Sequence, residues 1–167
     1  MKKLLLTLMM LPLMAIAQKP DVYINLSNAS GTPIKGNAVT RGFENWIQAT
    51  TIASGGKNNS QVNFTMNISG SAADLKKAQM SKELLNTGQI SVLQSGTTTT
   101  QYTIKMERVK VLECSETMGC DGVMTTTVTL QPVRIGWTYY SIGKSGLQTI
   151  SNKYGYDLDS GGAWTNF

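Results

Sequence analysis

The sequence predicts a mainly β domain: a two-sheet antiparallel β-barrel or sandwich with one flanking α-helix. Apolar and polar residues alternate in several separate segments, a helical pattern occurs once, and two long alternating segments flank a short polar stretch. Parallel sheets need a crossover, usually a helix, between successive strands, and a single helix cannot supply these connections. The 167 residues are enough for one domain with a substantial core.

The first residues have the three parts of a secretory signal peptide. Lys2 and Lys3 form a positive start, residues 4–14 are apolar but too few to span a bilayer, and residues 15–17 form a small-residue cleavage site. A retained membrane anchor and a buried N-terminal helix are the alternatives. We divide the chain into a signal peptide (1–17), a β-barrel domain (18–140) and a C-terminal extension (141–167) packed partly on the barrel. The mature protein is expected to be exported, periplasmic or secreted, and not membrane-bound.

The individual elements follow from local patterns. Alternation predicts strands over residues 21–26, 42–52, 61–68 and 89–94, and a short one over 147–151, with loops at 27–37 and 54–60. In the second strand the bulky residues are Phe43, Trp46 and Ile47. The helix is predicted over residues 72–87, with Ser71 as its N-cap and Gly88 just after its end.

Residues 101–140 are predicted to form a long hairpin. The apolar positions change parity in each arm, which predicts β-bulges near residues 107–108 and 131–132. If Cys114 faces Cys120, Met106 lies opposite Val128 in the same register. That register also pairs Ile104 with Leu130, so apolar residues meet apolar residues.

Cys114 and Cys120 are the only cysteines in the chain, and in an exported protein a pair is most simply a disulfide. The sequence contains no histidine, so a catalytic thiol would lack its usual partner and a zinc site would lack ligands. Asp157 and Asp159 in the segment 157–161 resemble part of a calcium loop, but a full loop needs more carboxylates, so we interpret it as a turn. No metal or cofactor is predicted.

The charge pattern argues against two further functions. The net charge of +5 is mild and its lysines are scattered, which does not favour nucleic-acid binding. The acidic residues form no evident catalytic pair, and the sequence has no nucleophile or phosphate-binding motif, so no catalytic residues are assigned. A structural or binding role is the expectation.

Three segments in order resemble the haemolysin-coregulated protein (Hcp) family, the tube subunit of type VI secretion. The family has a glycine-aromatic-x-x-Trp-Ile motif, a Y-x-x-x-L-E-x-V strand, and a late strand of the form V-S-L-x-F-x-x-I-x-W-T-Y. Two positions depart from the last motif, because Pro132 replaces its Phe and Gly136 replaces a Glu. The matching residues are Gly42, Phe43, Trp46 and Ile47; Tyr102, Met106, Glu107 and Val109; and Val128, Leu130, Ile135, Trp137, Thr138 and Tyr139.

The resemblance implies a β-barrel without catalytic residues that forms homohexameric rings, which stack into a tube carrying small effector proteins. Its motif residues are then structural, and Trp46 and Trp137 are expected in the core or between ring subunits rather than in a ligand site. The alternative is a monomeric secreted β-sandwich that binds a glycan or a surface partner through the loops at 27–37 and 55–60.

Overall fold

The computed structural model describes residues 21–55, 60–143 and 147–167. The predicted signal peptide and part of the 54–60 loop lie outside these residues. The described part contains eight strands and one helix: β1 Val22–Ser27, β2 Ile47–Ser54, β3 Val62–Asn67, α1 Gly70–Ser81, β4 Leu84–Leu93, β5 Thr100–Met118, β6 Met124–Ile142, β7 Gln148–Asp157 and β8 Gly162–Ala163.

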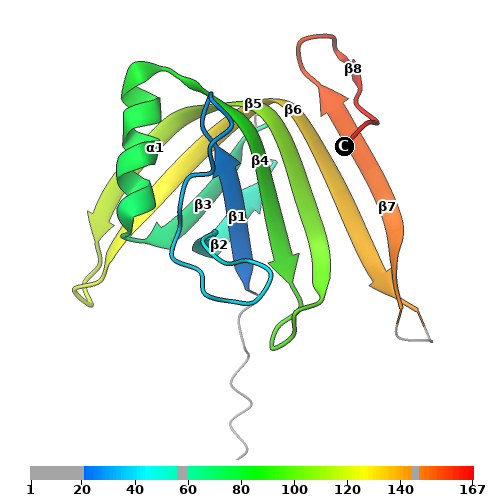
Figure 1. Ribbon diagram of the computed structural model, residues 1–167, viewed down its shortest axis with the longest axis horizontal. Coiled ribbons are helices and arrows are strands. Elements are labelled where there is room, and N and C mark those ends of the chain that lie inside the picture. Colours follow the sequence, from blue (N-terminus) through cyan, green and yellow to red (C-terminus); the bar gives the residue numbers. More distant parts are fainter. Residues whose placement is uncertain (1–20, 56–59, 144–146) are drawn as a thin grey trace, which may run out of the picture.

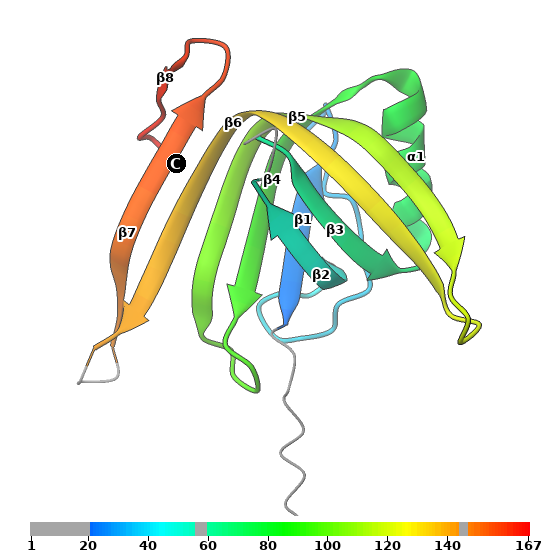
Figure 2. The same cartoon turned by 180° about the vertical axis from the view of Figure 1, so that it is seen from behind.

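The strands form one antiparallel sheet that closes on itself. Its order is β3-β2-β1-β4-β5-β6-β7-β8, and β3 also pairs with β6. The strands β1 to β6 therefore make a closed barrel, from which β7 and β8 continue outward along the free half of β6 (Figure 1). The helix α1 lies on the side away from β7, and the view from behind agrees (Figure 2). The predicted mainly β barrel with one flanking helix is confirmed.

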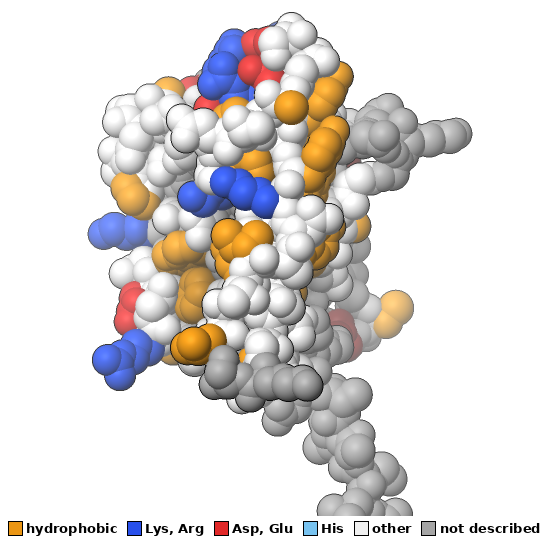
Figure 3. All heavy atoms as spheres, turned by 90° about the vertical axis from the view of Figure 1, so that its right-hand side faces the viewer, with side chains coloured by type: hydrophobic (Ala, Val, Ile, Leu, Met, Phe, Trp, Pro, Cys, Tyr) orange, Lys and Arg blue, Asp and Glu red, His pale blue; other side chains and the backbone are white. Residues whose placement is uncertain are grey.

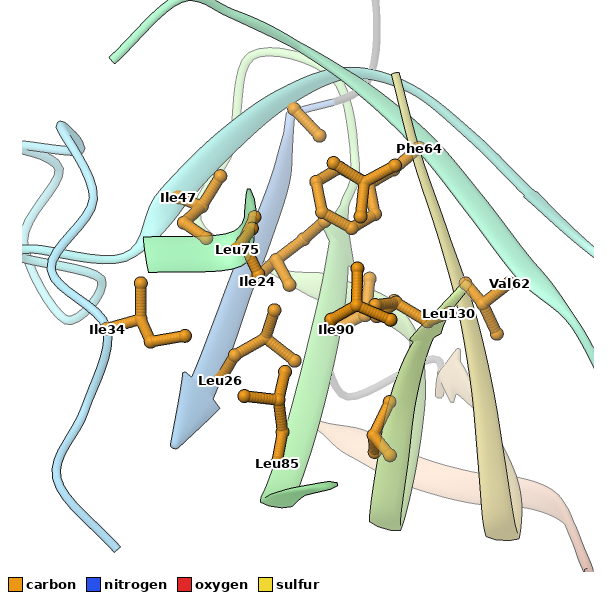
Figure 4. Close-up of a cluster of buried hydrophobic side chains, with 14 of the residues drawn as sticks. Ile24, Leu26, Ile34, Ile47, Val62, Phe64, Leu75, Leu85, Ile90 and Leu130 are labelled. Carbon is orange, nitrogen blue, oxygen red and sulfur yellow. The ribbon is translucent and has the colours of Figure 1, made fainter. Parts of the chain in front are cut away.

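Alternation along the strands fills the barrel with apolar side chains. In β3, Val62, Phe64 and Met66 are at most 1% exposed, whereas the residues between them are more exposed. Leu75 of α1 reaches the same cluster from outside the sheet (Figure 4). Burial of this kind stabilises a domain by roughly 1.5–3 kcal/mol for each large apolar side chain.

The predicted helix is correct in kind but too long. α1 ends at Ser81, and Lys82 adopts a left-handed conformation (φ 56°) that terminates it. Leu84–Leu93 is strand β4, paired with both β1 and β5. Leu85 fits the apolar side of a helix and the buried side of a strand equally well. The segment forms a strand because both of its edges pair with neighbouring strands. The N-cap is Ser69 rather than Ser71, which is buried.

The second predicted strand begins later than expected. Residues 42–46 form turns, in which Gly42 and Asn45 have positive φ angles of 87° and 63°. β2 starts at Ile47, whose side chain is fully buried in the main core. Phe43 and Trp46 instead pack with Tyr23, Ala38 and Leu93 in a second, smaller cluster.

The predicted hairpin exists, but its register was wrong. Cys114 lies opposite Val128, Met106 opposite Ile135, and the turn is closed by the amide of Gly119 donating to the carbonyl of Val123 (2.9 Å). Cys120 lies inside this turn, so the two cysteines do not face each other.

Both cysteines are free thiols, contrary to the predicted disulfide. The Cys114 Sγ lies 3.9 Å from the carbonyl oxygen of Ala72 in α1, and Cys120 is exposed. Burial raises the pKa of the Cys114 thiol. The side chain of Cys114 therefore contributes to the packing of α1 on the barrel.

The parity change in the hairpin arises differently from the predicted bulges. Glu107 pairs with Arg134 and Val109 with Pro132, so Arg108 and Val133 leave the ladder at the same level without shifting the register. Arg108 has a positive φ of 52°. A register shift lies further along, between Val111 and Glu113.

Candidate assembly surface

The free half of β6 and all of β7 form an extension that we call the arm, comprising Arg134–Ile142 and Gln148–Asp157. β3 pairs with β6 only as far as Leu130, so beyond that point β6 can accept β7 as its neighbour. Residues opposite each other in an antiparallel pair share a face. The two faces of the arm therefore follow from the register, and they differ in chemistry.

One face of the arm continues the apolar interior of the barrel. Ile104 of β5, Trp137 of β6 and Tyr154 of β7 lie in one row, and the rings of Trp137 and Tyr154 stack at 6.0 Å. The next row contains Met106, Ile135 and Tyr156. This face borders a hollow of about 850 Å³, whose lining includes the following side chains: Gln131, Ile135, Trp137, Tyr154, Tyr156 and Leu158.

Apolar side chains on this part of the molecule are unusually exposed. Tyr154, on the apolar face, is 58% exposed. Ile150 pairs with Tyr140, lies on the opposite face and is 59% exposed, and Leu147 just before β7 is 70% exposed. Figure 3 looks onto the side of the molecule where β7 lies and shows hydrophobic side chains distributed among polar ones. Large apolar side chains exposed beside a hollow are a feature of interaction surfaces.

The opposite face of the arm is held to the barrel by charges. Arg134 donates from Nε to Asp157 Oδ2 (2.8 Å) and from a terminal nitrogen to Glu107 Oε2 (3.1 Å). These three residues occupy one row across β5, β6 and β7. Arg134 of β6 thus links its two neighbours, β5 of the barrel and β7 of the arm, on the face opposite the apolar one.

Asp157 also closes the turn after β7, since its Oδ1 accepts the amide hydrogens of Asp159 (3.0 Å) and Ser160 (3.3 Å). Hydrogen bonding from Arg134 lowers the pKa of Asp157 despite its burial, and the two amides add to the effect. The same pairing raises the pKa of Arg134. The predicted turn at residues 157–161 is thus held by the carboxylate of Asp157.

The stability that this carboxylate provides is expected to be lost in acid. Because the folded-state pKa of Asp157 lies below the unfolded value of about 3.9, its contribution is present above that pH and disappears as the pH falls through the lower folded value. Asp157→Asn should lower the unfolding temperature at neutral pH, and its difference from the unmodified protein should shrink below about pH 4. Thermal unfolding of both proteins between pH 7 and pH 2 checks this; a constant difference would contradict it.

The remaining predicted residues fall into five groups. Tyr102 and Trp137 are half-buried against the main core, Phe43 and Trp46 belong to the second cluster, and Tyr139 is 47% exposed. Glu107 pairs with Arg134. Burial raises the pKa of Tyr102 to about 12, and its hydroxyl lies 3.2 Å from Ser54 Oγ. The residues inside the main core are Ile47, Val109, Val128, Leu130 and Ile135.

Sequence patterns missed the other half of the surface. Tyr154, Tyr156 and Leu158 lie in the tail whose elements were not predicted beyond residue 151, although their spacing of two is the signature of a strand face. The two departures from the family strand are also explained. Pro132 is buried next to Val133, which leaves the ladder, and a Cβ atom at Gly136 would lie 2.5 Å from the ring of Phe167, which would have to move.

Two further observations concern metal ligands and membrane spans in the described residues. None of their His, Cys, Asp or Glu side chains gather into a group of three or more suited to a metal ion. Within those same ranges, no helix is long and apolar enough to cross a membrane.

The chain is similar to known secretion proteins. Residues 23–139 match the family "Type VI secretion system effector, Hcp". Hcp1 from Salmonella typhimurium aligns with a TM-score of 0.72 at 14% identity, covering 87% of this chain and all of that one. A mutant of Hcp1 from E. coli EAEC 042 aligns with a TM-score of 0.66 at 21% identity, covering 84% of this chain and 99% of that one. The secreted protein Hcp3 from Pseudomonas aeruginosa aligns with a TM-score of 0.63 at 18% identity, covering 83% of this chain and 98% of that one.

Among curated proteins, no match was found. The solved structures are too distant in sequence to carry more than the fold, whereas the family match spans most of the barrel. Fold and family match agree with the order of the three motifs in the sequence. The chain belongs to the Hcp family of type VI secretion proteins.

Proposed function

We propose that this protein is a non-enzymatic structural subunit that assembles head to tail into a homohexameric ring. The observation that carries the proposal is the apolar face of the arm, with its hollow of about 850 Å³ beside Trp137 and Tyr154. On this face the ring of Tyr154 is 58% exposed and would remain in water in an isolated molecule. Covering it with another copy removes this cost, which is roughly 25 cal/mol for each Å² of apolar surface.

Unpaired strand edges supply a second argument. Among the described strands, none pairs with the outer edge of β7 over residues 148–153 or with the outer edge of β5 over residues 113–118. These edges lie at opposite ends of the molecule, the first at the arm and the second beside α1 (Figures 1 and 2). Two different surfaces on opposite ends are what a head-to-tail contact requires, and such a contact closes into a ring when the rotation fits.

Family membership supports the ring size and its use. Rings of six that stack into a tube, with small effector proteins in the lumen, are what the Hcp resemblance implies. We infer the same role here, with the arm of one copy contacting the α1 end of the next. The partner of each subunit is therefore another copy of the same chain.

The solution mass of the mature protein tests the proposal. Residues 18–167 should give particles of six times the subunit mass by light scattering at high-micromolar concentration. Electron micrographs of these particles should show rings. A strict monomer at every concentration would contradict the ring, and a monomer with an intact barrel would leave the secreted binding module as the better function.

Export is the second part of the proposal. We place the mature protein outside the cytoplasm, because residues 1–17 have the charge, length and cleavage pattern of a signal peptide. Mass spectrometry of the protein recovered from cells should find an N-terminus at Gln18. Recovery of a chain that retains residues 1–17 in the soluble cytoplasmic fraction would contradict export.

A further inference from the structure

A second hollow lies on the outer face of the barrel, where β1, β4 and β5 run side by side (Figure 1). The ladder places Asn25 of β1, Gln89 of β4 and Lys105 of β5 in one row. The same row continues into Gly136 of β6 and Gly155 of β7. Because residues paired in this way share a face of the sheet, three polar side chains and two glycines form one continuous outer strip.

The two glycines make room for an aromatic wall beside the polar side chains. A Cβ atom added at Gly136 would lie 2.5 Å from the ring of Phe167, and one added at Gly155 would collide with the same ring. The Trp164 ring packs on the Phe167 ring with 4.8 Å between their centres, and the Trp164 amide donates to the carbonyl of Gly155 (2.9 Å). The Phe167 ring therefore rests directly on β6 and β7, beside the polar part of the strip.

The polar side chains and the aromatic wall border a hollow of about 360 Å³. Sites for small molecules have volumes of about 300–1,000 Å³, so this one suits a ligand at the small end of that range. Such sites are usually lined mainly by apolar side chains, whereas most of the side chains here are polar. The polar ones are Asn25, Thr87, Gln89, Lys105, Glu107 and Asn166.

Several polar groups of the hollow are not engaged by the protein itself. Across residues 21–55, 60–143 and 147–167, no hydrogen bond or ion pair engages the side chain of Asn25 or Lys105. Gln89 donates from Nε2 to Ser91 Oγ (3.4 Å), and its amide oxygen accepts no hydrogen from any described residue. In its ion pair Glu107 uses only Oε2. Donors and acceptors thus lie together, as a ligand with both kinds of group requires.

We propose that this hollow binds a mono- or disaccharide. A sugar ring has a face of C–H groups that packs on an aromatic wall, and its hydroxyl groups both donate and accept hydrogen bonds. The amides of Asn25 and Gln89 each offer donors and an acceptor, so each can bind a pair of neighbouring hydroxyls. Lys105 adds donors, and the second carboxylate oxygen of Glu107 adds an acceptor.

Other classes of ligand fit less well. An apolar molecule would cover the amides and the Lys105 ammonium without hydrogen bonds, which is unfavourable. A small anion would leave the aromatic wall unused and would approach the carboxylate of Glu107. An extended peptide needs an unpaired strand edge, whereas β4 and β5 are paired on both sides at this level. The site lies on the face opposite the apolar hollow, so it goes beyond the proposed ring and does not depend on it.

Saturation-transfer NMR on the full mature chain tests the site. The probes are glucose, galactose, N-acetylglucosamine, glucuronic acid, lactose and cellobiose. Each is measured with the unmodified protein and with Tyr154→Arg, so that no ring contact covers the hollow. At least one neutral probe should bind saturably. Asn25→Ala with Gln89→Ala should weaken that binding at least about tenfold, because the change removes both amides. Phe167→Ala should also weaken it, because the aromatic wall is lost.

The matched control is Asn63→Ala, which removes a half-buried asparagine of β3 that does not line the hollow and should leave binding unchanged. Thermal unfolding verifies that each variant is folded. No saturable binding of any probe to either folded protein would overturn the proposal. Binding that survives both changes in the hollow would place the sugar elsewhere and would overturn it as well. Binding restricted to glucuronic acid would indicate an anion site and reject the saccharide.

Discussion

Phe64→Ala is expected to lower the free energy of unfolding by about 3–5 kcal/mol, the usual cost of removing a buried phenylalanine. Phe64 is 1% exposed and lies in β3, the strand whose pairing with both β2 and β6 closes the barrel. Its direct partners are Ile52 and Val128, and it belongs to the main core. The cavity would therefore lie at the seam of the barrel, where β3 joins β2 to β6.

Urea unfolding followed by circular dichroism measures this effect. The matched control is Thr65→Ala, the next residue of the same strand, whose half-buried side chain points to the other face. Its expected cost is below about 1 kcal/mol. If Phe64→Ala lowers the free energy of unfolding no more than the control does, packing at the β3–β6 seam does not contribute measurably to stability. Measurement at two protein concentrations separates subunit unfolding from dissociation.

The fold was predictable because strand alternation and family motifs are local signals. The alternation of Val62, Phe64 and Met66 with polar residues predicts a strand without further information. All three side chains are buried in β3, as this prediction requires. The helix end was not predictable in this way, since Leu84 and Leu85 suit either element and only pairing with β1 and β5 decides. Pairing partners are distant in sequence, and no pattern within one segment reveals them.

The hairpin register failed for a related reason. The assumption that Cys114 faces Cys120 produced a register in which apolar residues met, yet another register also satisfies that rule. The turn at Gly119–Val123, with Gly122 at a positive φ of 75°, fixes the actual one. The tail was the largest omission: Gly155 and Tyr154 could not be assigned a role before β7 was known to pair with β6.

Tyr154→Arg is expected to convert the proposed ring into monomers without unfolding the barrel. Tyr154 is 58% exposed and stacks on Trp137 beside the hollow, so its ring presents apolar surface to a neighbour. Removal of an aromatic hot-spot residue from an interface costs at least about 2 kcal/mol, which corresponds to roughly a thirtyfold change in a dissociation constant. Introducing a charge there adds a desolvation cost to the lost contact. Each contact of the ring carries this penalty, so the closed particle should be lost altogether.

Light scattering on the variant and the unmodified protein measures the outcome, with circular dichroism to verify the fold. The control is Val39→Arg, since Val39 is a hydrophobic residue 91% exposed in the loop between β1 and β2, outside the arm. The control should keep the particle mass. If both variants lose it, the effect comes from added charge alone. If both keep it, the ring is built through another face and the hollow beside Trp137 has a different use.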